Sequence, residues 1–116
     1  MPTGTRLKRI EDRVQQELTS MLIRDVNDPR LKQIFVTGVK IDRELTHANV
    51  YVSAIEGTAR SAEVLAGLES ASGFLRRELS ARVEVRAFPK LLFHWDPTPE
   101  NADHIEKLLA GLRNKK

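Results

Sequence analysis

The chain has 116 residues, the length of one ordinary domain, and its hydrophobic content of 41% is sufficient for one core. It contains no cysteine, which excludes a disulfide framework, a thiolate metal site and cysteine-based nucleophilic chemistry. Its 19 Lys and Arg exceed its 16 Asp and Glu, and the resulting net charge of +3 favours a polyanionic partner, although many basic proteins bind no nucleic acid.

The first half of the chain predicts a helix followed by a β-hairpin. Apolar residues recur every three or four positions over 6–25, which predicts an amphipathic helix that ends before Pro29. Residues 34–41 and 48–55 are rich in β-branched side chains and alternate with polar ones, and a polar turn separates them. We expect two paired strands with one buried face, on which Phe35 accompanies Val39 and Ile41.

The second half predicts further helices and one more strand. A helical pattern starts at Ser61, a candidate N-cap, and extended patterns follow over 82–88 and 91–96. Pro89 lies between these two segments, and proline cannot donate to a strand ladder, so we expect a bulge or an edge strand there. Helical spacing returns from 102 to 112, before a short basic tail.

The predicted order is therefore α-β-β-α-(break)-α-β-α in a single domain spanning residues 1–116, with a core over about 6–112 and a basic tail at 113–116. No stretch approaches the roughly 18 consecutive apolar residues of a membrane span, and the N-terminus lacks the apolar centre of a signal peptide. We expect a soluble cytoplasmic protein.

Gly73 lies inside the helical pattern that starts at Ser61, and the apolar stripe continues past it. A helix-interior glycine costs about 1 kcal/mol relative to alanine, so its presence there calls for a compensating gain. One interpretation is that Gly73 lets a neighbouring strand pack closely against a straight helix. The other is that the helix bends or restarts at Ser72, whose hydroxyl caps the second segment and leaves free amides as a phosphate cradle.

Four separate stretches resemble the ribosome-binding factor A family, in the expected order and over nearly the whole chain. They are "DPRL", "VTGVKIDRELTHANVYVS", "SASGFLRREL" and "LLFHWD", the last followed by a helical segment that ends "IEKLL". The residues Ala71, Ser72 and Gly73 match the family's Ala-x-Gly kink, which stands where other KH domains have a GXXG loop. Lys90 departs from the family, which commonly has an acidic residue at that position.

The resemblance implies a type II KH-like α+β fold with a three-stranded mixed sheet packed on a kinked helix pair and the N-terminal helix. It also implies binding to the free 30S subunit and its 16S rRNA, assistance in late 30S maturation and 16S rRNA 5′-end processing, and a role in cold adaptation. It implies a monomer that performs no catalysis and uses no cofactor, membrane or small-molecule substrate.

The predicted RNA-binding residues surround the kink and the strand that follows it. They are Ala71, Ser72, Gly73, Arg76, Arg77, Arg82, Arg86 and Lys90. Aromatic residues make up only 5% of the chain, so we expect RNA contacts to depend mainly on phosphate charge and backbone amides. The alternative for each basic residue is a solvated surface position paired with a nearby glutamate.

Other polar residues give little indication of catalysis or metal binding. His47, His94 and His104 lack the paired spacing of a metal site, so we predict none. Asp96 beside His94 has no accompanying nucleophile motif, and we predict no enzyme. Trp95 can stack on a base, but its position in a mostly apolar strand favours the core.

Two functional hypotheses follow from the sequence. The first is a non-enzymatic assembly factor that binds precursor ribosomal RNA in the small subunit. The second is a basic protein-protein adaptor that has no direct RNA contact and docks through its amphipathic helices. A steep dependence of binding on salt favours the first hypothesis, and a flat one favours the second.

Overall fold

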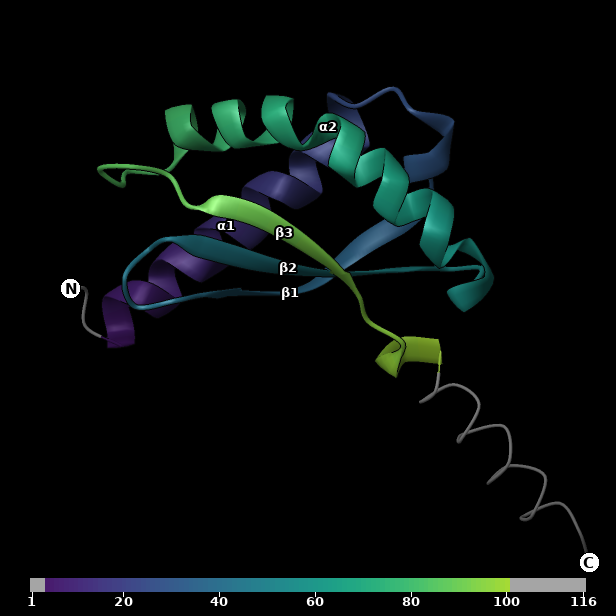
Figure 1. The fold of residues 1–116 in the computed structure, drawn as a ribbon, viewed down its shortest axis with the longest axis horizontal. Coiled ribbons are helices and arrows are strands. Elements are labelled where there is room, and N and C mark those ends of the chain that lie inside the picture. The colour runs from purple at the N-terminus through teal and green to yellow at the C-terminus, as the bar shows by residue number, and fades with distance from the viewer. Residues whose placement is uncertain (1–3, 101–116) are drawn as a thin grey trace, which may run out of the picture.

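The computed structural model describes residues 4–100. In chain order its elements are α1 (Gly4–Arg24), η1 (Pro29–Leu31), β1 (Ile34–Ile41), β2 (His47–Ala54), η2 (Thr58–Arg60), α2 (Ser61–Arg82) and β3 (Lys90–Trp95), where η marks a short 3-10 helix (Figure 1). The strands follow the order β1-β2-β3; β1 and β2 are antiparallel, and β2 and β3 are parallel. The predicted α+β class with a three-stranded mixed sheet is confirmed. The predicted C-terminal helix, over 102–112, lies outside the described residues.

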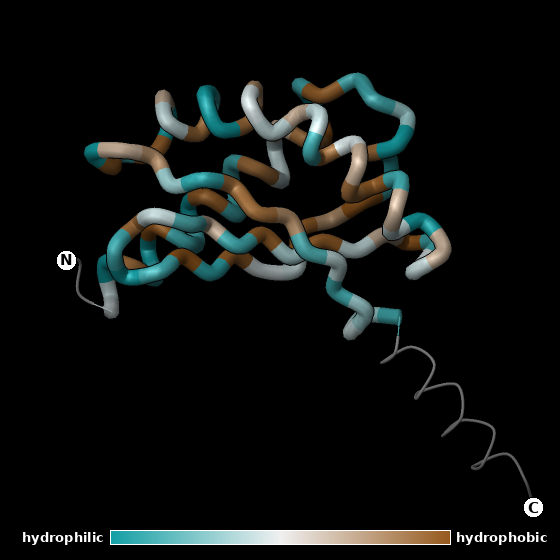
Figure 2. Tube along the Cα trace, in the orientation of Figure 1, coloured by the Kyte–Doolittle hydropathy of each residue, from teal (hydrophilic) through white to brown (hydrophobic). Residues whose placement is uncertain are grey.

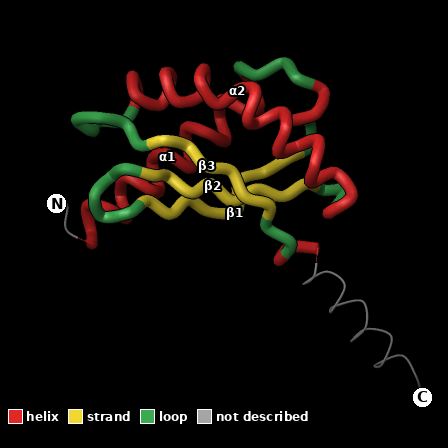
Figure 3. Tube along the Cα trace, in the orientation of Figure 1, coloured by secondary structure: helices red, strands yellow, loops and turns green. Residues whose placement is uncertain are grey.

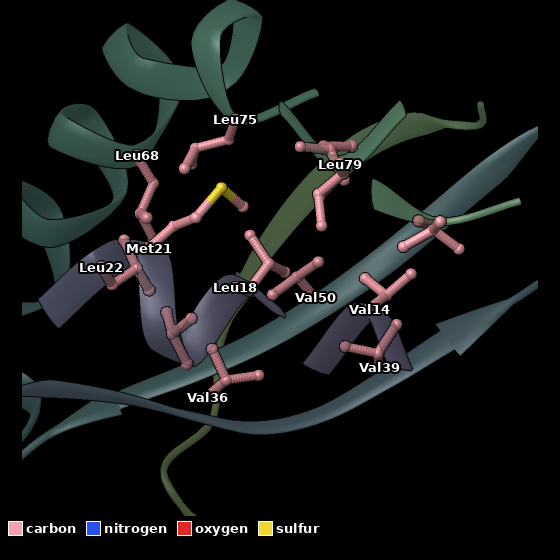
Figure 4. Packing of buried hydrophobic residues seen from close by; sticks show 14 of the residues in the cluster. Val14, Leu18, Met21, Leu22, Val36, Val39, Val50, Leu68, Leu75 and Leu79 are labelled. Carbon is pink, nitrogen blue, oxygen red and sulfur yellow. The ribbon is translucent and has the colours of Figure 1, made fainter. Parts of the chain in front are cut away.

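Both long helices pack their apolar stripes on one face of the sheet (Figure 3). Figure 4 shows Leu68, Leu75 and Leu79 of α2 directed toward side chains of α1 and of the sheet, and all three are fully buried. The hydropathy colouring of Figure 2 shows that hydrophobic residues alternate with hydrophilic ones along the strands, so one face of the sheet is apolar. One continuous core results, as the sequence pattern predicted.

The register of β1 changes at a β-bulge. Val36 pairs with Val52, but the next pair is Gly38 with Tyr51, so Thr37 is the additional residue. Because the bulge reverses the alternation, Val36 joins the buried side and Phe35 remains 37% exposed. The prediction that Phe35 shares a buried face with Val39 and Ile41 is wrong for this reason.

Polar side chains of α1 tie the helix to the edge strand β1. Glu11 is buried, and its Oε2 accepts a hydrogen bond of 2.8 Å from the backbone N–H of Ile41. One turn further on, the side-chain amide of Gln15 donates to the carbonyl of Val36 at 3.2 Å. These two contacts fix the position of α1 along the strand.

Two local predictions for the second half of the chain are wrong. Ser61 is not an N-cap, because η2 leads directly into α2 and the backbone of Ser61 is already helical, at φ −56° and ψ −45°. Residues 83–89 form a loop instead of a strand, and the N–H of Val85 bonds back to the carbonyl of Val83 within a tight turn. The expected edge strand is present as β3, directly after Pro89.

Candidate nucleic-acid interface

The segment 71–73, where a helix restart was predicted, lies inside one continuous helix. The α-helical assignment of α2 runs without interruption from Ser61 to Arg82. The hydroxyl of Ser72 donates to the carbonyl of Glu69 at 2.9 Å, whereas an N-cap hydroxyl accepts from an amide. The predicted second helix start at Ser72, with its cradle of free amides, is therefore wrong.

The helix is nevertheless bent, since its two halves point in different directions in Figure 1. Two serine hydroxyls bond backward to the helix near its middle, Ser70 to the carbonyl of Ala66 and Ser72 to that of Glu69. Such bonds compete with the helix ladder, and serine-glycine combinations are a common site of bending. The bend brings the C-terminal half of α2 over the sheet without breaking the helix.

Gly73 lies at an open position on the outer surface of α2. A Cβ built there would meet no described heavy atom within 4 Å, and the residue is exposed. The interpretation that this glycine admits a closely packed strand is therefore also wrong. What Gly73 provides instead is a stretch of helix backbone that a ligand can approach.

The closely packed glycine of α2 is Gly67, which the sequence analysis did not single out. A Cβ at this position would lie 2.9 Å from Cδ2 of Leu31 and 3.2 Å from Cβ of Arg30. Leu31 is itself buried, so its side chain has little room to withdraw. Gly67 thus allows the "DPRL" turn to pack against the N-terminal half of α2.

Charge pairs hold this turn in place. Arg30 donates to both carboxylate oxygens of Asp28, and these hydrogen bonds lower the pKa of Asp28 and raise that of Arg30. From the start of α2, the guanidinium of Arg60 donates to the carbonyls of Arg30, at 2.8 Å, and of Lys32. Arg60 also pairs with Glu63, which raises its pKa. The basic residues of this region are therefore largely engaged in the fold.

Two of the predicted RNA-binding arginines are likewise engaged. The guanidinium of Arg76 donates to the carbonyls of Phe88 and Pro89 at 2.7 and 3.2 Å, which fastens the loop 83–89 to α2. Arg82 lies 3.4 to 3.5 Å from carboxylate oxygens of three acidic residues, which are Glu17, Asp25 and Glu78. These two arginines are therefore held by different neighbours, Arg76 by the loop 83–89 and Arg82 by carboxylates.

The other three predicted cations are exposed and unpaired. Arg77 lies on the outer side of α2, Arg86 in the loop 83–89 and Lys90 at the start of β3. Within residues 4–100, none of their side chains makes a hydrogen bond or ion pair. Figure 1 shows the loop 83–89, the C-terminal end of α2 and the β1–β2 turn at the same end of the molecule.

The end of β1 and the turn that follows it add two cations that the sequence analysis missed. Lys40 and Arg43 are exposed, and neither side chain has a partner among the described residues. Asp42 organises the turn by accepting from the backbone amides of His47 and Thr46, and these bonds lower its pKa. The signal was available in the sequence, because the same alternation that buries Val39 and Ile41 exposes Lys40.

His94 and Asp96, the described residues considered as an acid and base pair, bond to different partners. His94 Nε2 lies 2.8 Å from Asn49 Oδ1, and Asp96 accepts from the hydroxyl of Thr37, which lowers the pKa of Asp96. No group of three potential metal-ligating residues occurs in this part, and His104 lies outside it. Trp95 packs partly buried against the core, which confirms its predicted place.

Over residues 4–100, no helix combines the length and the apolar character needed to cross a membrane.

The comparisons with known proteins agree with one another. The family model described as ribosome-binding factor A matches residues 6–109. Ribosome-binding factor A of Hahella chejuensis is 37% identical over 118 aligned positions, which cover 96% of this chain and 87% of that protein.

Solved structures show the same similarity. The crystal structure of ribosome-binding factor A from Thermus thermophilus superimposes with a TM-score of 0.68 at 27% identity, covering 76% of this chain and 93% of that one. A homology model of the Thermus thermophilus factor, fitted into a cryo-electron-microscopy map of a 30S complex, matches with a TM-score of 0.57 at 24% identity; 79% of this chain and 92% of that one are covered. This chain belongs to the ribosome-binding factor A family.

Proposed function

We propose that this protein binds the free 30S subunit by contacting its 16S rRNA, and that it assists late maturation of the subunit and processing of the rRNA 5′ end without catalysis. Family membership supports this proposal. The Thermus thermophilus factor fitted into the map of a 30S complex supports the same partner.

The observation that carries the RNA contact is the set of unpaired cations at one end of the molecule. Arg77, Arg86 and Lys90 come from a helix, a loop and a strand, and the fold brings these elements together beside the β1–β2 turn. Exposed cations without partners need not break an ion pair in order to bind phosphate. Phosphate contacts position a protein on RNA without reading its sequence, which suits a factor that recognises a folded subunit.

The mechanism requires only differential binding. A protein that binds one conformation of the rRNA more tightly shifts the population toward it, and each tenfold preference corresponds to about 1.4 kcal/mol. Gly73 and the adjacent Arg77 belong to the same surface, where the helix backbone is open to approach. No bond in the RNA is made or broken by the protein in this scheme.

Neutralising the three cations tests the proposal. The variant Arg77→Gln, Arg86→Gln, Lys90→Gln is compared with a matched control, Arg13→Gln, Arg24→Gln, Lys32→Gln, which removes the same charge elsewhere. Affinity for 16S rRNA fragments is measured over a range of salt concentrations. The slope of log K against log salt should become shallower by about 2 in the first variant, at about 0.7 per phosphate, and change little in the control.

Two results would count against the proposal. A flat salt dependence of the unmodified protein would favour the protein-protein adaptor, which docks without RNA. Equal losses in the two variants would show that only total charge matters. Sedimentation of the protein with isolated ribosomal particles tests the partner, and co-migration with complete ribosomes in preference to free 30S subunits would contradict the proposed role.

A further inference from the structure

The sheet has a second face, which the helices leave uncovered. Figure 1 views this face, with α1 behind the strands and no described helix in front of them. Along β2, Asn49 and Tyr51 are half-buried on this side, whereas Ala48, Val50 and Val52 are fully buried on the other. The register extends this face to both neighbouring strands, where Gly38 and His94 flank Tyr51.

Tyr51 and His94 form a stacked pair on the uncovered face. Their ring centroids lie 5.1 Å apart, at an interplanar angle of 29°. The contact between His94 Nε2 and Asn49 Oδ1, at 2.8 Å, holds the imidazole in this orientation. The pair therefore forms a fixed aromatic surface in which His94 occupies one side of the tyrosine.

The strand on the other side of Tyr51 offers no side chain. Its register partner there is Gly38, and a Cβ at Gly38 would meet no described heavy atom within 4 Å. An aromatic residue opposite a strand glycine often packs over it and compensates for the missing side chain. Here the tyrosine stacks on His94 instead, and the surface above Gly38 stays open.

Positive charge lies on the same face between the opening and the β1–β2 turn. Lys40 is the next residue of β1 on the same face, and Lys90 begins β3 on that face. Both lysines are exposed, and neither side chain has a partner within residues 4–100. A polyanion that follows this face from the opening toward the β1–β2 turn therefore meets a cation on each edge strand, and both are unpaired among the described residues.

A carboxylate marks the opposite end of the face. Asp96 reaches from the end of β3 to the hydroxyl of Thr37 in β1, at 2.6 Å, and also accepts from the N–H of Thr98. Its negative charge repels phosphate at that end. The charges on this face would therefore favour phosphates near the lysines over phosphates near Asp96.

We propose that an unpaired base of the rRNA stacks on the open side of Tyr51, above Gly38, while adjacent phosphates lie against Lys40 and Lys90. The inference rests on the proposed function, to which it adds a base contact and a preference for single-stranded RNA. Stacking on an aromatic ring is available to any base, since every base has a π-face, but a base inside a duplex has both faces covered.

Filling the opening tests the proposal without removing any side chain. The variant Gly38→Val places a branched side chain beside Tyr51, and Gly38 does not have the positive φ that would make the substitution strained. Valine also favours a strand more than glycine does, so thermal unfolding should show an equal or higher melting temperature. Affinity for a single-stranded RNA should fall about tenfold, within the range measured for loss of one stacked base.

Two companion RNA probes separate the base from the phosphates. One is the same strand with abasic sugars, which keeps the phosphate charge, and the other is the strand annealed to its complement. The unmodified protein should bind the single strand more tightly than either. Gly38→Val should lower only the affinity for the single strand, toward that for the abasic strand.

A pair of tyrosine variants tests the ring itself. Tyr51→Phe keeps the aromatic surface and should retain the preference for the single strand, whereas Tyr51→Leu should abolish it. Full affinity of Gly38→Val for the single strand would overturn the inference. Unchanged RNA binding with weakened binding to intact 30S subunits would also overturn it, because this face would then contact a ribosomal protein.

The outcomes for the two proposals are distinguishable. If the unmodified protein binds RNA with steep salt dependence and Gly38→Val binds equally well, only the stacking site is wrong. If the unmodified protein binds none of the three RNA probes, the proposed RNA contact fails together with the stacking site.

Discussion

Each half of α2 contains a glycine, and the two glycines differ in what surrounds them. In the N-terminal half, Gly67 lies under Leu31, and an added Cβ would come within 2.9 Å of that side chain. In the C-terminal half, Gly73 has no described atom within 4 Å of its Cβ position. One glycine is required by the fold, while the other has no packing requirement in the described structure.

An arginine near each half shows a similar contrast between a residue engaged in the fold and one that is open. Arg60 directly precedes α2; its side chain is 13% exposed and is bonded to carbonyls and to two glutamates, whereas Arg77 is exposed and unpaired within the described residues. The helix therefore joins an anchored half to a half whose outer surface is available for binding. Substitutions in the first half should affect stability, and substitutions on the outer surface of the second should affect RNA binding.

The largest effect is expected from Gly67→Ala. Overpacking against Leu31 costs about 1–3 kcal/mol, and the better helix propensity of alanine offsets about 1 kcal/mol of this, so the free energy of unfolding should fall by up to about 2 kcal/mol. Urea denaturation measures the change. In a Leu31→Ala background the same substitution should cost nothing, and an undiminished cost there would show that the contact is not the cause.

Arg76→Met and Arg77→Met sharpen the comparison within the C-terminal half. Removing the Arg76 guanidinium leaves the carbonyls of Phe88 and Pro89 without their donor and should lower the free energy of unfolding by about 1 kcal/mol. Arg77→Met should change it by less than about 0.5 kcal/mol, as is usual at the surface. The two variants differ by one position, so equal losses of stability would contradict the assignment of partners.

Gly73→Ala should change the free energy of unfolding in the direction opposite to Gly67→Ala. Alanine is the better helix former and meets no steric obstacle, so the free energy of unfolding should rise by about 0.5–1 kcal/mol. Affinity for 16S rRNA fragments should fall if the RNA backbone approaches the helix at this point. A variant that is more stable and binds 16S rRNA fragments with full affinity would show that the RNA does not approach the helix at Gly73.

The smallest effect is expected from Asp28→Asn, on the stability of the protein at acidic pH. Hydrogen bonds from Arg30 lower the pKa of Asp28 in the folded state, so their contribution is present above the usual pKa of about 3.8 and is lost as pH falls through the lower folded value. Asp28→Asn should therefore flatten the decline of stability below about pH 4. Unfolding by urea at several pH values measures the slope, and an unchanged slope would indicate that other carboxylates dominate.

Periodicity predicted the long elements well, because each buries one continuous stripe or face. The first helix was expected over 6–25 and spans 4–24, and the hairpin strands begin and end within one residue of their predicted bounds. The bulge at Thr37 and the loop 83–89 were not predictable from alternation. Both depend on contacts between segments far apart in the chain, such as those of Arg76 with Phe88 and Pro89.

The candidate site was harder to predict than the fold. The sequence predicted a bend or a restart of the helix at residues 71–73 and overestimated the effect of one glycine, since the helix continues there and two serine hydroxyls bond back to its carbonyls. Whether an arginine is free or paired is a tertiary property, which is why Arg77 and Arg82 looked equivalent. The packing role of Gly67 depends on Leu31, which is distant in sequence.

The contacts between α1 and the first strand also bear on self-association. A sheet can grow into a fibre only if it offers a pairing edge on each side, so that every added copy exposes a new one. Here Glu11 and Gln15 already occupy a backbone N–H and a backbone carbonyl of β1, one of the two outer strands. These contacts hinder strand addition at β1, and a sheet that could grow only through β3 would join two copies and then stop.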